Sequence, residues 1–298
     1  MKSQIKKMAS IFLKGISIGL KWSINGLSEL HKKIEFIRLV RLDFVPRPDD
    51  IFIVTYPRSG TTWVQMILYL LTHDGKMDFQ HISMVSPFLE RFLERDIMTI
   101  AELEAYPSPR IIKSHLSYNA IPKGACKYIY IVRNGKDVLV SYFHFYQSHL
   151  KFKGTFSEFF ERFMQGKVQF KTWFKHVAGW LEHKDDPNVL LLQYEDLIHE
   201  PRGSIQKIID FCGFNNITPE QFSAILEKSS FTFMKKHGDK FDHLTGKMLE
   251  QGSIQGVFIR QGKIGESKKL LTEQQEQLFE QKFQEYLGAS GIDFEKNK

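Results

Sequence analysis

The chain of 298 residues has little cysteine, and Cys126 and Cys212 are too few for a disulfide framework. We therefore expect a protein of the cytoplasm, where thiols stay reduced. No apolar run is long enough to span a bilayer, and no small-residue cleavage site follows the apolar N-terminal stretch. With 42% apolar and 25% charged residues, the composition indicates one large domain with a sizeable core.

Two kinds of site are also missing from the sequence. The nucleotide-binding pattern G-x-x-x-x-G-K-[ST] occurs nowhere. There is no clear cluster of metal ligands, because the pairs His144/His149 and His237/His243 stand alone and are interpreted as surface or loop histidines. The sequence therefore predicts neither a Walker-type kinase site nor a metal centre.

The net charge of +7 is confined to one end of the chain. Residues 1–42 hold nine of the 41 basic residues against Glu29 and Glu35, which leaves 32 basic and 32 acidic residues in the remainder. Because nucleic-acid-binding domains carry a basic surface, this neutral remainder argues against a nucleic-acid partner. We divide the chain into a basic N-terminal arm, residues 1–42, and a single domain, residues 43–298.

Polar residues of the arm recur at alternating steps of four and three, which places them on one side of a helix. They are Ser3, Lys7, Ser10, Lys14, Ser17 and Lys21, with apolar residues around the rest of the helix. Two interpretations of this amphipathic helix stay open. It packs on the domain, or residues 1–24 attach weakly and reversibly to an anionic membrane.

Short apolar strands alternate with helical patterns along the domain. Strands are expected over residues 51–55, 110–114, 127–132 and 188–193, and helices over 62–72, 136–148, 155–165, 170–183, 204–212, 219–228 and 272–286. This order predicts an α/β fold with a central, mainly parallel sheet and helices on both faces, and a ligand at the carboxyl ends of the strands. Residues 235–256, rich in glycine and polar residues, read as a mobile loop that could serve as a lid.

The apolar run 51–54 leads into a turn rich in hydroxyl groups, T-Y-P-R-S-G-T-T-W over residues 55–63. A helix beginning at Thr62 would aim its positive end and the main-chain amides of residues 59–62 at one point beside the Arg58 guanidinium. Such a point binds a phosphate or a sulfated phosphate. An ordinary strand-turn-helix corner shaped by Pro57 and Gly60 stays open as the alternative.

Residues 55–63 resemble the phosphosulfate loop of the cytosolic sulfotransferases, a P-loop-like strand-loop-helix, with Arg58 in place of a lysine. Further similar stretches follow in the family's order at residues 107–115, 128–145, 194–197 and 229–231, and more faintly at 258–262. Together they span roughly residues 45 to 288. The resemblance implies transfer of a sulfuryl group from 3′-phosphoadenylyl sulfate (PAPS) to a small acceptor, with the bisphosphate PAP as product and no metal ion.

The resemblance also implies roles for individual residues. His115 falls at the position of the family's base, with Lys113 and Arg58 beside the transferring group. Donor binding is implied for Arg58, Ser59, Gly60, Thr61, Thr62, Trp63, Arg133, Ser141, Tyr194, Ser229, Phe231, Arg260 and Gly262. Phe88 and Phe145, with Lys113 and His115, would contact an apolar or aromatic acceptor. From the residues alone, an isolated histidine, a strand-end lysine and buried aromatic residues are as readily structural.

The sequence departs from the family's pattern in three places. Arg58 keeps the charge of the lysine but is bulkier. Near the C-terminus Gln261 replaces a cation and Ser267 an aromatic residue. In the family's dimer motif Glu273 replaces valine and Gln277 replaces glutamate. Because a small apolar contact tolerates a carboxylate poorly, we expect a monomer or a dimer through another surface.

Two other interpretations belong to different functional classes. A nucleotide kinase on a related strand-loop-helix is disfavoured because the Walker lysine is absent and no clear magnesium carboxylate is found. A binding protein that keeps the nucleotide site without turnover would explain the altered C-terminal motif, yet it would not need His115 as a base. The acceptor is not identified by the sequence, nor is the preference for a hydroxyl or an amine.

Overall fold

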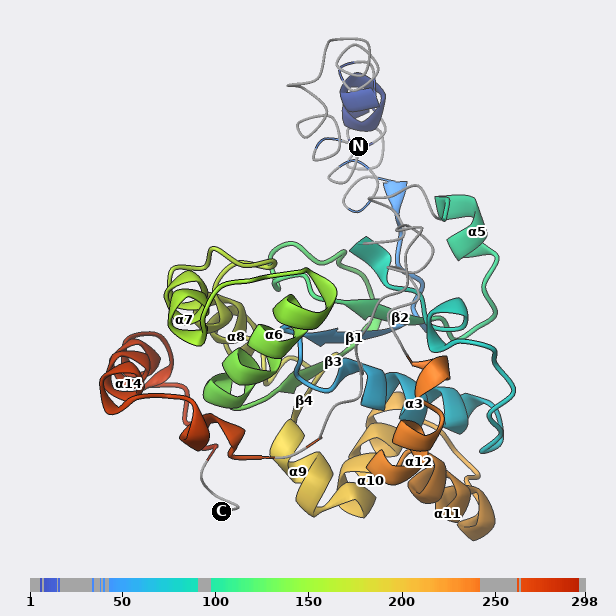
Figure 1. Ribbon diagram of the computed structural model, residues 1–298. Coiled ribbons are helices and arrows are strands. Elements are labelled where there is room, and N and C mark those ends of the chain that lie inside the picture. The colour runs from blue at the N-terminus through green and yellow to red at the C-terminus, as the bar shows by residue number, and fades with distance from the viewer. Residues whose placement is uncertain are drawn as a thin grey trace.

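The computed structural model describes residues 8–14, 43–90, 98–241 and 264–294, together with residues 6, 16, 34, 38, 40 and 262. At its centre lies a parallel sheet with the strand order β2-β1-β3-β4 (Figure 1). The strands are β1 (Ile51–Thr55), β2 (Ile111–Ser114), β3 (Lys127–Val132) and β4 (Val189–Gln193). The predicted α/β fold with a parallel central sheet is confirmed.

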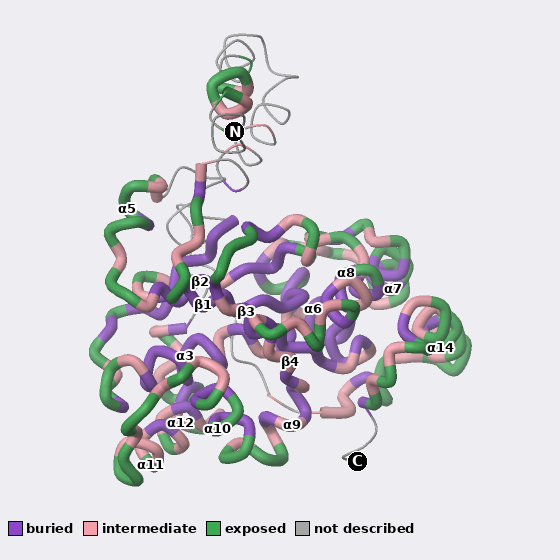
Figure 2. Tube along the Cα trace, turned by 180° about the vertical axis from the view of Figure 1, so that it is seen from behind, coloured by how far each residue is buried: buried purple, intermediate pink, exposed green. Residues whose placement is uncertain are grey.

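Helices cover both faces of this sheet, as Figures 1 and 2 show from opposite sides. One face packs on α6 (Gly135–His149), α7 (Phe156–Met164) and α8 (Trp173–Leu181), and α14 (Glu273–Leu287) lies against α8. The other face packs on α3 (Thr61–Thr72), α9 (Tyr194–His199), α10 (Pro201–Cys212), α11 (Pro219–Lys228) and α12 (Phe231–Lys236). Short elements complete the chain: η2 (Ile82–Met84), α5 (Ile100–Glu104), η3 (Gly238–Lys240) and η4 (Glu266–Lys269).

Alternate side chains of each inner strand enter two separate cores. In β1, Phe52 and Val54 pack with α6 and α8, whereas Ile51 and Ile53 pack with α3 and α10. A strand covered on both faces has no solvent side, so its sequence is a continuous apolar run instead of an alternating one. This explains why residues 51–54 and 128–132 are readable as buried strands.

The helix expected over residues 170–183 begins only at Trp173. Phe170 and Lys171 have left-handed backbone angles, with φ of 66° and 60°, and such residues cannot continue a right-handed helix. Helices α9 and α12 were not predicted, although Ser230 caps α12 by accepting a hydrogen bond from the Phe233 amide. Both are short helices that depend on packing for their stability, and so few residues show little helical periodicity in the sequence.

Parts of the expected lid and of the arm lie outside the described residues. Within 235–256, only 235–241 are described, and they form the end of α12, η3 and the residue after it. In the arm, residues 8–14 are helical and the Ser10 hydroxyl donates a hydrogen bond to Asp43. Ser3, Lys7, Ser17 and Lys21 fall outside the described residues. Among the described helices, none has the length and apolar character needed to cross a membrane.

Candidate active site

One cavity of about 410 Å³ opens at the carboxyl edge of the sheet, where all four parallel strands end. Every residue that the sequence proposed for the site lines this cavity except Ser59 and Arg260. Ser59 is fully buried within the loop between β1 and α3, and Arg260 lies outside the described residues. The fold thus brings residues from distant parts of the sequence together around a single space.

The loop between β1 and α3 is shaped by two left-handed residues. Gly60 has φ of 97° and is the N-cap of α3, and Arg58 has φ of 71°. A Cβ atom on Gly60 would lie 2.7 Å from the ring of Tyr194, so both the backbone angle and the close approach require glycine. The Trp63 amide is bonded to the Gly60 carbonyl at 3.0 Å, and the first-turn amides before it have no partner within an α-helix. The loop therefore presents a helix N-terminus to the cavity, which favours an anion.

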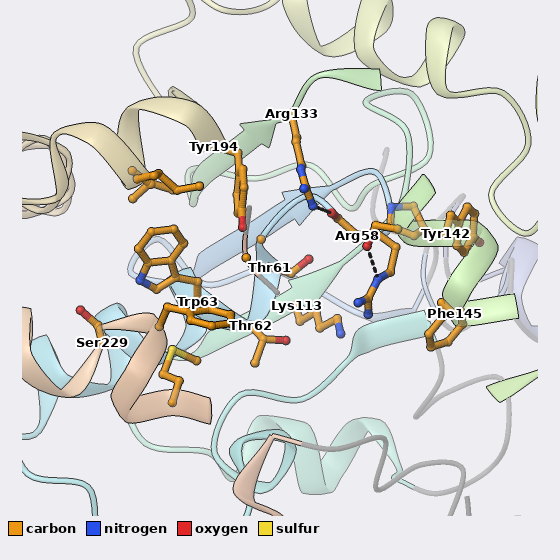
Figure 3. Close-up of a pocket in the computed structure, with 18 of the residues that line it drawn as sticks. Arg58, Thr61, Thr62, Trp63, Lys113, Arg133, Tyr142, Phe145, Tyr194 and Ser229 are labelled. Atoms are coloured by element: carbon orange, nitrogen blue, oxygen red, sulfur yellow. Dashed lines mark hydrogen bonds between the residues drawn. The ribbon is translucent and has the colours of Figure 1, made fainter. Parts of the chain in front are cut away.

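Cationic side chains from three elements converge on this loop (Figure 3). Arg58 Nε donates a hydrogen bond of 3.2 Å to Ser141 Oγ on α6, and Arg133 Nη1 donates one of 3.0 Å to the Arg58 carbonyl. Lys113, near the end of β2, also lines the cavity, with its Nζ 4.7 Å from the centre of the Phe88 ring. This clustering of positive charge suits a ligand with more than one anionic group.

Aromatic rings form one end of the cavity. Trp63 meets Tyr194 edge to face with ring centres 5.8 Å apart, and the Arg133 guanidinium lies 4.4 Å from the Tyr194 ring centre. Phe231 packs so closely on Gly262 that a Cβ there would lie 2.5 Å from its ring. Burial raises the pKa of Tyr194, so its hydroxyl stays protonated. These faces, with the buried Ser229, can hold a flat heterocycle.

The ring of His115 is held by the last residue of β1. Its Nδ1 lies 2.8 Å from the Thr55 carbonyl oxygen and 3.1 Å from the Thr55 hydroxyl. Because a carbonyl oxygen can only accept, Nδ1 carries the proton and Nε2 keeps its lone pair. Its ring is flanked by Phe88 and Phe170, whose ring centres lie 5.0 Å and 5.2 Å away. The sequence pointed to His115, but it carried no sign that Thr55, 60 residues earlier, orients it.

Two buried groups hold the main chain of His115. Its amide donates a hydrogen bond of 2.5 Å to Glu90 Oε1, and its carbonyl accepts one of 3.1 Å from His176 Nε2. Burial raises the pKa of Glu90 to about 7, and burial lowers the pKa of His176 to about 4, so that His176 is neutral at pH 7. Because the His115 carbonyl can only accept, His176 Nε2 carries the proton, and its Nδ1 accepts a hydrogen bond of 3.1 Å from the Tyr130 hydroxyl. His115 is therefore held in place from three sides.

The opposite end of the cavity is walled by Phe88, Phe145 and Phe170. The sequence analysis did not propose Phe170 as a site residue, because no turn signal in residues 168–172 predicts the left-handed backbone at this position. Three tyrosines hold that turn. The hydroxyls of Tyr56 and Tyr142 donate to the carbonyls of Lys171 and Gln169 at 2.8 Å and 3.1 Å, and the Tyr146 hydroxyl accepts from the Gln169 amide at 2.7 Å. The wall is thus apolar and held in a defined shape.

The interpretation of His149 as a surface or loop histidine is wrong. It is the last residue of α6, is 6% exposed, and stacks on Phe145 with ring centres 4.7 Å apart. Burial, and next the charge of Arg58, lower the pKa of His149 to about 4. A neutral His149 therefore supports the acceptor wall from behind.

Asp137, in the first turn of α6, holds the C-terminal segment beside the cavity. The amides of Gly265 and Ser267 donate to its carboxylate at 2.7 Å and 3.2 Å, and Gly262 and Glu266 line the cavity. Sequence reasoning did not identify Asp137 as this anchor. Among the described residues, there is no group of three or more His, Cys, Asp or Glu side chains that could hold a metal ion.

Residues 48–291 match the family model of the sulfotransferase domain. The chain is 34% identical over 260 residues to sulfotransferase 1C2 of Rattus norvegicus, covering 84% of this chain and 87% of that protein. It is 37% identical over 254 residues to the amine sulfotransferase of Oryctolagus cuniculus, covering 82% of each chain.

Solved structures of similar fold include two complexes. The mouse sulfotransferase SULT7A1 complexed with PAP has a TM-score of 0.71 and 31% identity, covering 86% of this chain and 89% of that chain. Retinol dehydratase in complex with androsterone and PAP has a TM-score of 0.74 and 25% identity, covering 85% of this chain and 84% of that chain.

Proposed function

This chain belongs to the sulfotransferase family, and from that premise we propose that it transfers a sulfuryl group from PAPS to a hydroxyl of a small apolar or aromatic acceptor, with His115 as general base. The observation that carries the proposal is the 2.8 Å contact between His115 Nδ1 and the Thr55 carbonyl, which leaves the lone pair on Nε2. A neutral imidazole in the wall of the cavity can accept the acceptor's proton near pH 7.

The residues at the donor end fit PAPS. The buried Nε1 of Trp63, a residue that lines the cavity, has no hydrogen-bond partner among the described residues, as expected of a group that binds a ligand. The loop 58–62 would hold the 5′-phosphosulfate, and Arg133, Ser141 and Gly262 would hold the 3′-phosphate. Arg260, from the faint part of the sequence match, completes this set as a proposal from sequence alone. SULT7A1 and retinol dehydratase, both solved with PAP, support the same donor here.

The purine would lie between aromatic faces at the same end of the cavity. Trp63, Tyr194 and Phe231 supply those faces, and Ser229 supplies a hydroxyl beside them. Arg133 is stacked on Tyr194 and so reaches the phosphate region and the purine region together. This position makes Arg133 the residue whose loss should affect donor binding most.

In the proposed reaction the acceptor oxygen attacks sulfur while its proton passes to His115 Nε2. A new S–O bond forms to the acceptor as the S–O bond to the 5′-phosphate breaks, and the electron pair of that bond leaves with PAP. Lys113 and Arg58 stabilise the charge that develops on the leaving phosphate. His115 then returns its proton to solvent. Positioning and charge neutralisation carry the catalysis, so the step as written needs no metal ion.

The acceptor end favours a flat or apolar molecule. Phe88, Phe145 and Phe170 form its walls, and His115 lies between two of them. The relatives widen the range to be tested: one is solved with androsterone, and another is named for amines. We propose a hydroxyl acceptor because proton removal by a base is required for an alcohol or a phenol.

The proposal is tested by screening phenols, steroids, aliphatic alcohols and amines with labelled PAPS. With the best acceptor, His115→Ala should lower turnover by about 100-fold or more, while PAP binding, measured by calorimetry, stays within about twofold. His144→Ala, a histidine of the same helix as Ser141 that does not line the cavity, is the matched control. Near-normal turnover of His115→Ala would remove it as base. Tight PAP binding without transfer to any acceptor would instead indicate a binding protein.

A further inference from the structure

The described part of the N-terminal helix exposes an apolar face. Met8, Ile11 and Phe12 are 72%, 65% and 69% exposed, and Ile16 is 39% exposed. Their spacing of i, i+3, i+4 and i+8 places them on one side of a helix. Exposed large apolar side chains are scarce elsewhere in the described chain, so their concentration in this short helix calls for a partner.

The other side of the same helix contacts the chain. Ala9, Ser10 and Leu13 are half-buried, and the Ser10 hydroxyl donates a hydrogen bond to Asp43, the first residue of the domain. In both overall views this helix stands apart from the sheet and the helices that cover it (Figures 1 and 2). The helix is therefore tethered on one side and presents its apolar face outward.

Positive charge accompanies the apolar face. Lys6 and Lys14 are exposed within the same helix, and residues 1–42 as a whole carry a net charge of +7 while the remainder of the chain carries none. A surface that is both apolar and cationic matches a partner with an anionic rim over an apolar interior. A nucleic acid offers the charge without the apolar interior, and a second copy of this chain would bring the same positive charge.

We propose that the exposed face formed by Met8, Ile11, Phe12 and Ile16 is a docking surface for an anionic lipid bilayer. The four apolar side chains enter the boundary between headgroups and acyl chains, and the lysines of the arm meet anionic headgroups. The helix lies in the plane of the membrane surface and does not cross it. The binding is weak and reversible because the inserted face is short. It does not depend on which reaction the cavity catalyses.

The test is co-sedimentation of the full-length protein with vesicles of phosphatidylcholine containing about one third phosphatidylserine, at low and at high salt. We expect binding at low salt, release by salt, and no binding to pure phosphatidylcholine. The triple variant Met8→Ser/Ile11→Ser/Phe12→Ser and the charge variant Lys6→Glu/Lys14→Glu should each lower the partition coefficient by about tenfold or more.

Matched variants on the domain test whether vesicle binding requires this surface or arises from exposed apolar and basic residues in general. Met84→Ser/Leu278→Ser removes exposed apolar side chains of the domain, and Lys153→Glu/Lys167→Glu reverses exposed lysines there; both should bind vesicles like the parent. Thermal unfolding of every variant checks that the domain is intact. The proposal would be overturned if the full-length protein did not bind vesicles at low salt. It would also be overturned if the arm variants and the domain variants lost vesicle binding to the same extent. Self-association abolished by the triple variant would show that a second copy covers the face.

Discussion

His115 Nδ1 lies 2.8 Å from the carbonyl oxygen of Thr55, the last residue of the neighbouring strand β1. The bond joins the residue before the anion-binding loop to the proposed base, so that the loop and the base are positioned by the same strand end. The Thr55 hydroxyl continues the connection, since it lies 2.7 Å from the Thr61 hydroxyl at the start of α3.

The substitution Thr55→Val tests which group of Thr55 orients the base. This variant keeps the main-chain carbonyl and loses the hydroxyl, so His115 keeps its tautomer and turnover should fall by less than about tenfold, with an unchanged pH profile of kcat/KM. The Thr61 hydroxyl loses its buried partner, which should lower the free energy of unfolding by about 1–3 kcal/mol. Thr55→Ser is the control. A loss as large as that of His115→Ala would show that the hydroxyl, and not the carbonyl, holds the ring.

Arg133→Ala should distinguish the two phosphates of the donor. We propose that Arg133 binds the 3′-phosphate, and a charge-assisted hydrogen bond contributes about 1.5–3 kcal/mol, or roughly 10- to 150-fold in affinity. Calorimetry should therefore show a much larger loss for adenosine 3′,5′-bisphosphate than for adenosine 5′-phosphate. Arg162→Ala, at an exposed position on α7, should change neither. Equal losses for both nucleotides would place the second phosphate elsewhere.

Glu90 should make the stability of the protein depend on pH. Burial raises its pKa from 4.5 to about 7 in the folded chain, so between these values the folded protein keeps a proton that the unfolded chain has released. Stability contributed by Glu90 is therefore complete below pH 4.5 and is lost as the pH rises to 7. Glu90→Gln removes this loss, so its unfolding free energy relative to the parent should rise by about 3 kcal/mol across that window.

Denaturant unfolding at about pH 4.5, 6 and 7.5 measures this difference. The exposed Glu182→Gln makes the same chemical change without burial and should give a flat difference. A flat difference for Glu90→Gln as well would show that Glu90 is ionised throughout, held by the His115 amide and the Ser114 hydroxyl.

The C-terminal segment should not support the family's dimer. Glu273 and Gln277 are exposed on α14, where the family motif has valine and glutamate. Analytical ultracentrifugation at micromolar concentration should show a monomer, or a dimer that survives changes in this segment. Glu273→Val/Gln277→Glu restores the motif and should promote self-association, whereas Gln274→Val should not. A stable parent dimer that dissociates on mutation of Thr272 would contradict the prediction.

The local chemistry of the donor loop could be predicted from sequence. Four apolar residues followed by Pro57, Gly60 and two threonines specify a buried strand, a tight turn and a helix start, because each depends on neighbouring residues only. The same holds for Thr155, Thr218 and Thr272, each of which caps a helix through a bond to the third residue of that helix. Helix ends were less predictable where the backbone turned left-handed at Phe170.

The linear chain was enough to predict the four strands and the longer helices, and it supplied the hypotheses of an anion-binding loop and, through resemblance, of His115 as base. How that histidine is held became visible only in three dimensions, because Thr55, Glu90 and His176 lie 60, 25 and 61 residues away along the chain. The physical reason is the range of the interactions. Apolar runs and caps act between near neighbours, whereas the tautomer of a buried imidazole depends on which carbonyl the fold places beside it.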